Sequence, residues 1–243
     1  MRVIADVLSS TWRFCPCLLN GGSGIGAGIG TIHAACAARR VGLQASGGKC
    51  AHGSADGDAG MIWSVGMSEL TVPVSALDHI QGNLDAAVVL VEYADYQCPY
   101  CGEAFSLVKR LQQRFGEGLC LVFRNFPLVQ SHPQALPAAI TAEYAAEHGK
   151  FWEAHDALFR SQQQLGELVY RELMRELGLP EEGLAAAMGE NRNLLRIQRD
   201  IESGMRSGVT GTPGFFINGA LFQPRQSFEE LYDAIIQAGA GSN

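Results

Sequence analysis

The sequence lacks the basic excess that proteins bound to nucleic acid or to an anionic membrane usually carry. Its 243 residues include 18 Lys and Arg against 25 Asp and Glu, for a net charge of −7. Both kinds of surface select for positive charge. The chain also lacks any apolar run of about 18 residues, the length that a membrane-spanning helix requires. We therefore expect a protein that spans no membrane and whose main partner is not nucleic acid.

The start of the chain lacks the pattern of a secretory signal. Asp6 interrupts the early apolar run and Arg13 follows it, whereas a signal needs a basic start, an apolar core and a small-residue cleavage site. The seven cysteines are an odd number at irregular spacing, unlike the framework of a disulfide-stabilised secreted domain. We expect a cytoplasmic protein that needs no structural disulfide.

Residues 1–66 lack a sustained hydrophobic period of either helix or strand. Glycine dominates residues 21–30 and small residues dominate 46–60, yet neither stretch completes a nucleotide-binding motif. The cysteines and histidines of this segment are too irregularly spaced to predict a metal site. We predict a disordered or non-native extension, with Met67 as the functional start and residues 67–243 as the folded domain.

The most informative stretch is a β-prone run that leads into two cysteines separated by two residues. Residues 87–93 are rich in apolar and β-branched side chains, as in a strand covered on both faces. Apolar residues at helical spacing follow over 104–115. Cys98 and Cys101 therefore lie where a strand becomes a helix, and we interpret them as a redox dithiol.

The start of a helix favours a thiolate, because its unpaired N–H groups and its dipole stabilise negative charge. Cys98 is therefore expected to be the attacking thiol, with a lowered pKa. Cys101 lies three residues on, within reach to close a disulfide and release a mixed-disulfide partner. Pro99 suits an early helical position, where its missing N–H forfeits no hydrogen bond.

Half a zinc site and an inert cysteine pair are the other interpretations of this spacing. Zinc needs two more ligands, and after residue 101 only Cys120 and three histidines remain, with no second close-spaced pair. An inert pair is more often buried in the middle of an element. We predict a redox dithiol with no metal and no other cofactor.

The remaining sequence predicts a second strand, a helical insertion and a C-terminal hairpin. A strand over 119–126 completes a βαβ unit whose sheet is at least partly parallel. Asn218-Gly219 between apolar runs is a strong hairpin signal, and a helix over 228–238 closes the chain. The insertion covers about 133–208, with helices expected at 134–148, 150–164, 166–177, 181–189 and 191–206.

This combination resembles the thioredoxin fold, and the large insertion is similar to that of the DsbA-like thiol–disulfide oxidoreductases. The resemblance covers about residues 72–240. It implies an α/β thioredoxin fold with a large all-helical insertion between the CxxC-bearing βαβ unit and the C-terminal β-hairpin and helix. The matching motifs are Val91-Glu92-Tyr93, Cys98-Pro99-Tyr100-Cys101, the stretch from Phe123 to Leu128 and the stretch from Gly211 to Gly219.

The resemblance also implies roles for further residues. Thr212-Pro213 is expected to be a cis peptide beside the dithiol, with a backbone available to a substrate strand. Pro99 and Tyr100, between the cysteines, join it as expected substrate-binding residues. Glu92 takes the place of a buried acid that helps to move the proton of the resolving thiol, and an acid at a strand edge is its other interpretation. The Pro-Tyr dipeptide is more usual in glutaredoxins, which leaves the redox poise open.

We predict an enzyme that exchanges its dithiol or disulfide with protein substrates through a mixed disulfide. Its partners would be protein thiols and disulfides, with a recycling protein or glutathione. A glutathione-linked reductase or transferase of the same fold is one alternative, and a non-catalytic thioredoxin-like binding or metal-holding module is another. Both cysteines and the Thr-Pro turn are present, which favours the first hypothesis.

Overall fold

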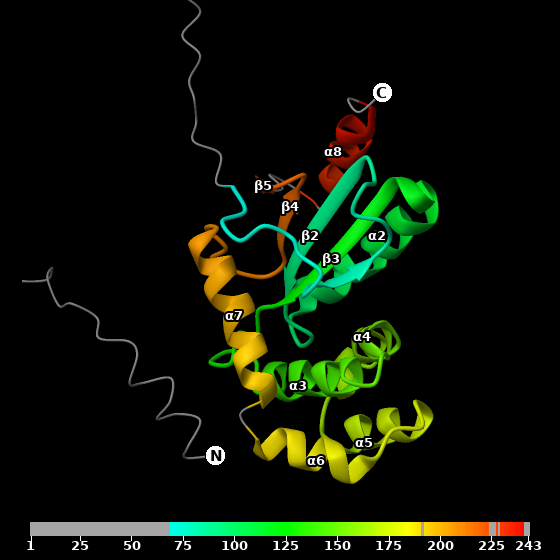
Figure 1. Cartoon of the computed structure of the whole chain (residues 1–243), viewed down its shortest axis with the longest axis vertical. Coiled ribbons are helices and arrows are strands. Elements are labelled where there is room, and N and C mark those ends of the chain that lie inside the picture. Colours follow the sequence, from blue (N-terminus) through cyan, green and yellow to red (C-terminus); the bar gives the residue numbers. More distant parts are fainter. Residues whose placement is uncertain (1–68, 191, 224–226, 228, 241–243) are drawn as a thin grey trace, which may run out of the picture. The chain divides into compact units, whose positions relative to one another are not determined.

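The computed structural model describes residues 69–190, 192–223, 227 and 229–240. The prediction made for residues 1–66 lies outside this part. No helix among the described residues is both long and apolar enough to cross a membrane. One five-stranded sheet organises the described part, in the order β1-β3-β2-β4-β5 (Figure 1). Its strands are β1 (His79–Gln81), β2 (Val88–Ala94), β3 (Leu119–Asn125), β4 (Gly214–Ile217) and β5 (Ala220–Phe222).

Strand β2 is the middle strand of the sheet. It pairs in parallel with β3, where Val91 lies opposite Val122, and antiparallel with β4, where Val91 lies opposite Phe216. Six of its seven residues are buried, because side chains on both of its faces are covered, and this explains the nearly continuous apolar run. The prediction of a partly parallel sheet is confirmed.

Strand β1 is an element that the sequence analysis did not predict. Residues 79–81 pair antiparallel with β3 at the edge of the sheet, and three residues are too few for a hydrophobic period to reveal a strand. Arg124, buried on β3, holds this segment in place. Its guanidinium donates to both carboxylate oxygens of Asp78, at 2.8 and 3.1 Å, and to backbone carbonyls of residues 72 and 73.

The predicted hairpin is confirmed. Strands β4 and β5 are joined by Asn218 and Gly219, whose φ angles are 48° and 84°, while Ile217 pairs with Ala220. Two consecutive positive φ angles are the requirement of a tight hairpin turn whose twist matches its strands, and asparagine followed by glycine meets it at low cost.

Helices cover the sheet and build the insertion. Leu231 and Ile235 of the last helix pack with the CxxC-bearing helix against Leu90 of β2. The opposite face carries Val91, Val122 and Phe216. The helices are α2 (Pro99–Phe115), α3 (Ala135–Ala146), α4 (Phe151–Arg160), α5 (Glu167–Glu176), α6 (Glu181–Gly189), α7 (Arg192–Arg206) and α8 (Glu229–Ala240).

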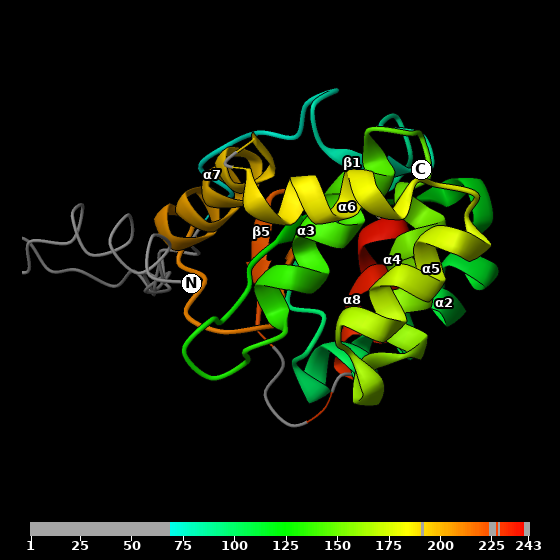
Figure 2. The same ribbon diagram turned by 90° about the horizontal axis from the view of Figure 1, so that it is seen from below.

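Helices α3 to α7 stand between β3 and β4, as the predicted insertion requires, and α3 to α6 gather beyond one end of the sheet (Figures 1 and 2). Their shared core also contains Tyr96, Cys98 and Cys101. The dithiol therefore lies where the insertion meets the sheet. Methionine and aromatic side chains of the insertion belong to this core or pack against it: Tyr144, Phe151, Trp152, Phe159, Met174 and Met188.

Candidate active site

The two cysteines occupy the first turn of α2, directly after the middle strand. Strand β2 ends at Ala94, and Cys98 is the residue that caps α2, with φ −69° and ψ 121°. This extended conformation is what a residue before proline prefers. Pro99 then begins the helix, so the position expected for the dithiol from the sequence is the position observed.

Both thiols are free, and they differ in exposure. Cys98 is 4% exposed and Cys101 is fully buried. The carbonyl oxygen of Cys98 accepts hydrogen bonds from the N–H groups of Cys101 and Gly102, at 3.0 and 3.2 Å. The Sγ of Cys101 accepts a long hydrogen bond of 3.5 Å from the N–H of Asp95. An incoming sulfur atom therefore meets Cys98 first.

The surroundings of Cys98 favour its thiolate. The hydrogen bond from the Cys101 thiol lowers the pKa of Cys98 most, and the Thr212 side chain and the N–H groups of Cys101 and Tyr100 lower it further, to about 5. Burial opposes this shift without reversing it. The backbone contribution is the helix-start effect expected from the sequence. At neutral pH, Cys98 is therefore a nucleophile without further activation.

Cys101 has the opposite tendency. Burial raises its pKa well above the ordinary value, and the neighbouring Cys98 and, to a smaller extent, Glu92 raise it further. A thiol that resists ionisation needs help to lose its proton before it can attack a mixed disulfide. Cys98 and Cys101 thus divide into an ionised and a protonated sulfur, which is the division of roles that the sequence predicts.

Glu92 lies beneath the dithiol on β2, where it is 2% exposed. Because β2 is an inner strand, the interpretation of Glu92 as an acid at a strand edge is wrong. Burial raises the pKa of Glu92 to about 8, although Lys109 opposes the shift. Its Oε1 has no hydrogen-bond partner among the described residues. A buried carboxyl with a pKa near neutrality, electrostatically coupled to Cys101, is suited to exchange a proton with that thiol.

Thr212 and Pro213 complete the site from the far end of the chain. Their peptide bond is cis, and the Sγ of Cys98 lies 3.4 Å from the carbonyl oxygen of Thr212. The Thr212 hydroxyl is buried and has no hydrogen-bond partner among the described residues. Tyr100, between the cysteines, is 64% exposed, and Pro99 beside it is also exposed. The structure thus brings both expected substrate-binding pairs close to Cys98.

A carboxylate that the sequence analysis did not single out fixes the loop before Cys98. Asp95 is 1% exposed. Its Oδ1 accepts from the N–H of Gln97 at 2.7 Å, and its Oδ2 accepts from the N–H of Leu128 at 2.9 Å. The Nδ1 of His132 lies 2.7 Å from the same Oδ2. An aspartate two residues before the N–H that it accepts is a known turn signal, so Asp95 was detectable, whereas its link to His132 was not.

Gln162 holds the same loop from the insertion. Its Nε2 donates to the carbonyl oxygens of Tyr96 and Cys98, at 2.8 and 2.9 Å. A Cβ at Gly102 would lie only 2.3 Å from the Oε1 of Gln162, so the glycine makes room for this contact. Nothing in the sequence pairs a glutamine 64 residues downstream with the CxxC turn. No group of three or more residues suited to a metal ion occurs in the described part of the chain.

Comparison with known proteins agrees with this geometry. The family model described as Thioredoxin matches residues 75–237. A thioredoxin-like oxidoreductase from Silicibacter pomeroyi DSS-3 superposes with a TM-score of 0.59 at 29% identity, covering 68% of this chain and 93% of that one. Oxidised BdbD from Bacillus subtilis superposes with a TM-score of 0.61 at 20% identity, covering 68% of this chain and 94% of that one. For α-DsbA1 from Wolbachia pipientis the TM-score is 0.60 at 17% identity, covering 71% of this chain and 96% of that one. The latter two likenesses show the fold.

Curated relatives share sequence over one part of their length. The chain is 37% identical over 180 residues to the Na(+)/H(+) antiporter NhaA 3 of Salinispora tropica, which covers 74% of this chain and 28% of the antiporter. It is also 37% identical over 143 residues to the Na(+)/H(+) antiporter NhaA of Herminiimonas arsenicoxydans, which covers 59% of this chain and 22% of the antiporter. The chain therefore spans less than a third of the length of either relative.

Proposed function

We propose that this chain, which belongs to the thioredoxin family and has the fold of DsbA-like proteins, is a thiol–disulfide oxidoreductase in which Cys98 and Cys101 carry out the exchange with protein substrates. The observation that supports this most is the division of the pair into a Cys98 thiolate, with a pKa near 5, and a buried Cys101 thiol. The names of the curated relatives describe Na(+)/H(+) antiport by much longer proteins, of which this chain matches less than a third. The thiol–disulfide exchange proposed for this chain depends on its dithiol.

In the reducing direction, the Cys98 thiolate attacks one sulfur of a substrate disulfide. A Cys98–substrate disulfide forms and the second substrate sulfur leaves as a thiolate that takes up a proton. Glu92 in its ionised form, which grows as the pH approaches 8, then takes the proton of Cys101, and the Cys101 thiolate attacks the Sγ of Cys98. The Cys98–Cys101 disulfide forms, the first substrate sulfur leaves as a thiolate that takes up a proton from Glu92 or from water, and two electrons have passed from enzyme to substrate.

The oxidising direction is the reverse of these steps. A substrate thiolate attacks the Sγ of Cys98 in the enzyme disulfide, and Cys101 leaves and recovers its proton through Glu92. Whatever stabilises the Cys98 thiolate stabilises the reduced pair, and this makes the disulfide a stronger oxidant. The low pKa of Cys98 therefore favours electron flow from substrate to enzyme. The cytoplasmic location stays a prediction.

Thr212, Pro213 and Tyr100 are proposed to hold the substrate during the exchange. The carbonyl oxygen of Thr212 lies beside the Sγ of Cys98, so a substrate strand that contacts this turn would carry its cysteine to the nucleophile. The exposed ring of Tyr100 offers apolar area on the other side of Cys98.

The experiment is to equilibrate the pair with glutathione redox buffers and to trap its mixed disulfides. Cys101→Ser should accumulate a mixed disulfide with a protein substrate, and Cys98→Ser should form none. Cys120→Ala is the matched control, because Cys120 is a buried free thiol on β3 outside this site. Alkylation at graded pH should label Cys98 first, with a midpoint near pH 5. Two results would refute the proposal and favour a binding module. One is thiol exchange that persists in Cys98→Ser, and the other is a folded protein whose Cys98–Cys101 pair fails to equilibrate with any of the glutathione buffers within hours.

A further inference from the structure

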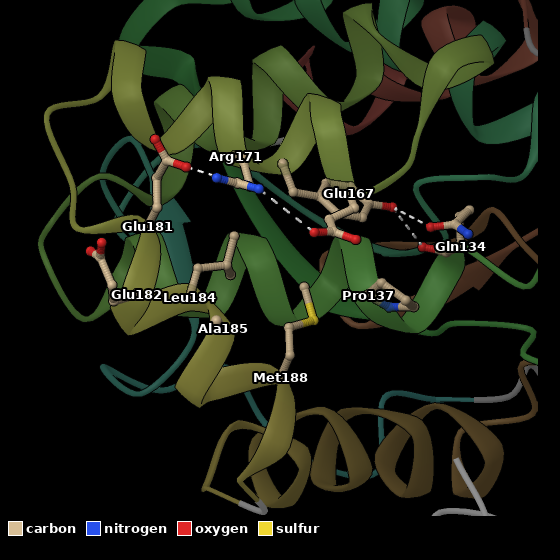
Figure 3. Close-up of a pocket in the computed structure, with 10 residues that line it drawn as sticks. Gln134, Pro137, Glu167, Arg171, Glu181, Glu182, Leu184, Ala185 and Met188 are labelled. Atoms are coloured by element: carbon tan, nitrogen blue, oxygen red, sulfur yellow. Dashed lines mark hydrogen bonds and ion pairs between the residues drawn. The ribbon is translucent and has the colours of Figure 1, made fainter.

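A pocket in the helical insertion has no role in the thiol chemistry described above. We call it the insertion pocket. It has a volume of about 560 Å³ and lies among residues of α3, α5 and α6 and the turn before α3, within the size range of ligand-binding cavities. Apolar side chains line much of it, among them Pro137, Tyr170, Leu184 and Met188. Figure 3 shows Met188 reaching toward the charged side chains on the opposite rim.

The charged side chains of the insertion pocket are mostly acidic. Three carboxylates and one guanidinium line it: Glu167, Glu181 and Glu182, and Arg171. Arg171 lies between two of these acids (Figure 3). Its Nε is 2.8 Å from Glu181 and its Nη1 is 3.9 Å from Glu167. The positive charge inside the pocket is therefore already paired.

Glu182 is the pocket carboxylate that forms no direct ion pair with another described residue, although it lies near enough to Arg171 to raise the pKa of that guanidinium. It is exposed. Arg175 also pairs with Glu181, at 3.1 Å, from outside the lining. Even with Arg175 included, carboxylates outnumber guanidinium groups. A ligand with an apolar part and a positive charge is the chemical complement of such a surface.

The insertion pocket is connected to the dithiol by a short series of hydrogen bonds. The Tyr170 hydroxyl donates to the carbonyl oxygen and the side-chain oxygen of Gln134, at 3.3 and 3.1 Å. The backbone N–H of Gln134 donates to the Oε1 of Gln97 at 2.6 Å. Gln97 directly precedes Cys98. A hydrogen bond between two glutamines thus links the pocket wall at Gln134 to Gln97, the residue next to Cys98.

An extended protein segment could follow the surface between Cys98 and the insertion pocket. Gln97 and Gln134 are both partly exposed, and Pro133 beside them is exposed, so a chain can run across them. An extended chain advances roughly 3.3 Å per residue. Because only Gln97 and Gln134 lie between Cys98 and Tyr170 along this series, a substrate whose cysteine is bonded to Cys98 would place a residue a few positions away in the insertion pocket.

We propose that the insertion pocket is a second binding site for protein substrates, which takes an apolar side chain with an adjacent Lys or Arg a few residues from the reacting cysteine. This inference rests on the proposed function. It adds to the exchange a preference for substrate segments that carry an apolar side chain beside a basic one. A folded protein would expose such a segment less often, because its apolar side chains are usually buried.

The test measures competition between a peptide and glutathione for Cys98. The full chain with Cys101→Ser is first converted to its Cys98–glutathione mixed disulfide. A peptide thiol then displaces glutathione, so that one disulfide breaks, one forms and one glutathione thiol is released. Three peptides share one cysteine and differ only at the fourth and fifth positions after it, which carry Leu-Lys, Leu-Glu or Ser-Ser. The exchange equilibrium constant of each is read by mass spectrometry.

The Leu-Lys peptide should displace glutathione about tenfold more favourably than either of the others, because a single well-placed apolar and charged contact commonly discriminates by this factor. Glu182→Lys should abolish or invert the preference of Leu-Lys over Leu-Glu. Met188→Gln should reduce the preference of both leucine peptides over Ser-Ser. Glu172→Lys is the matched control, because Glu172 is exposed on the same helix as Glu167 and does not line the pocket. It should keep the wild-type ratios.

The outcomes separate this inference from the proposed function. If Cys98 forms the glutathione adduct and all three peptides exchange equally, the insertion pocket is not a substrate site, although the exchange activity stands. A preference that Glu182→Lys and Met188→Gln leave unchanged also overturns the inference. If Cys98 accepts neither glutathione nor any peptide while the protein is folded, the proposed function itself fails.

Discussion

Replacing Glu92 with glutamine should make the protein more stable at neutral pH and slow its catalysis. Glu92 is 2% exposed and lies on the middle strand. Burial raises its pKa from an ordinary value of 4.5 to about 8, so the folded state holds this proton more tightly than the unfolded state does. The contribution of Glu92 to the unfolding free energy is therefore most favourable below about pH 4.5, and it decreases as the pH rises toward 8.

The size of the effect follows from these two pKa values. Each pH unit above 4.5 costs about 1.4 kcal/mol of unfolding free energy until Glu92 loses its proton near pH 8. At pH 7 the cost reaches about 3 kcal/mol. Glutamine has nearly the same volume and cannot ionise. Glu92→Gln should therefore match the wild type near pH 4.5 and exceed its unfolding free energy by about 3 kcal/mol at pH 7.

The assay is urea denaturation of the reduced protein near pH 4.5 and at pH 7. Glu153→Gln, an exposed change on α4, is the control and should show no such pH dependence. A stability difference between Glu92→Gln and the wild type that is equal at both pH values would refute the reasoning. In a chase experiment, Glu92→Gln should also release mixed disulfides roughly 100-fold more slowly, the lower end of general acid–base effects. Unchanged release would exclude Glu92 from the proton transfer.

Three further changes have defined outcomes. Thr212→Val removes a buried hydroxyl that makes no hydrogen bond within the described part of the chain but belongs to a side chain that lowers the pKa of Cys98, and the thiolate absorbance should then titrate at a higher pH; an unchanged midpoint would exclude the hydroxyl. Gln162→Ala loses two hydrogen bonds to the CxxC loop and should lower the unfolding free energy by about 1 to 3 kcal/mol, measured by denaturation against Gln163→Ala, an exposed neighbour. A chain that begins at Met67 should unfold and exchange thiols as the full chain does, and loss of cooperative unfolding would contradict this.

The fold was predictable because local patterns and long-range structure agree in most of this chain. The apolar run before Cys98 becomes the middle strand, and Asn218-Gly219 becomes the tight turn of a hairpin. Each of these signals is short in sequence and rests on backbone preferences that need no distant partner. Strand β1 escaped detection, because its three residues are specified by pairing with β3 and not by a period of their own.

The dithiol was predictable for the same reason. Two cysteines spaced by two residues, with proline after the first, already define a helix start, and a helix start already stabilises a thiolate. The chemistry of Cys98 therefore follows mainly from Cys101, its neighbour in sequence, while Thr212 adds to it from a distant part of the chain. The resemblance to the DsbA-like family added Glu92 and the Thr212-Pro213 turn, which lie six residues before and more than a hundred residues after the first cysteine.

Only the tertiary structure decided how the rest of the site is supported. The depth of Glu92 follows from the place of β2 inside the sheet, which the sequence of one strand does not specify. Gln162 meets the carbonyl of Cys98, and the pocket beside Gln134 forms, because helices from a separate insertion pack against the CxxC loop. Such contacts join residues tens of positions apart through side-chain geometry, and no local spacing records them. The sequence by itself therefore determined where the dithiol lies, while packing determined the burial of Glu92, the restraint on the loop and the insertion pocket.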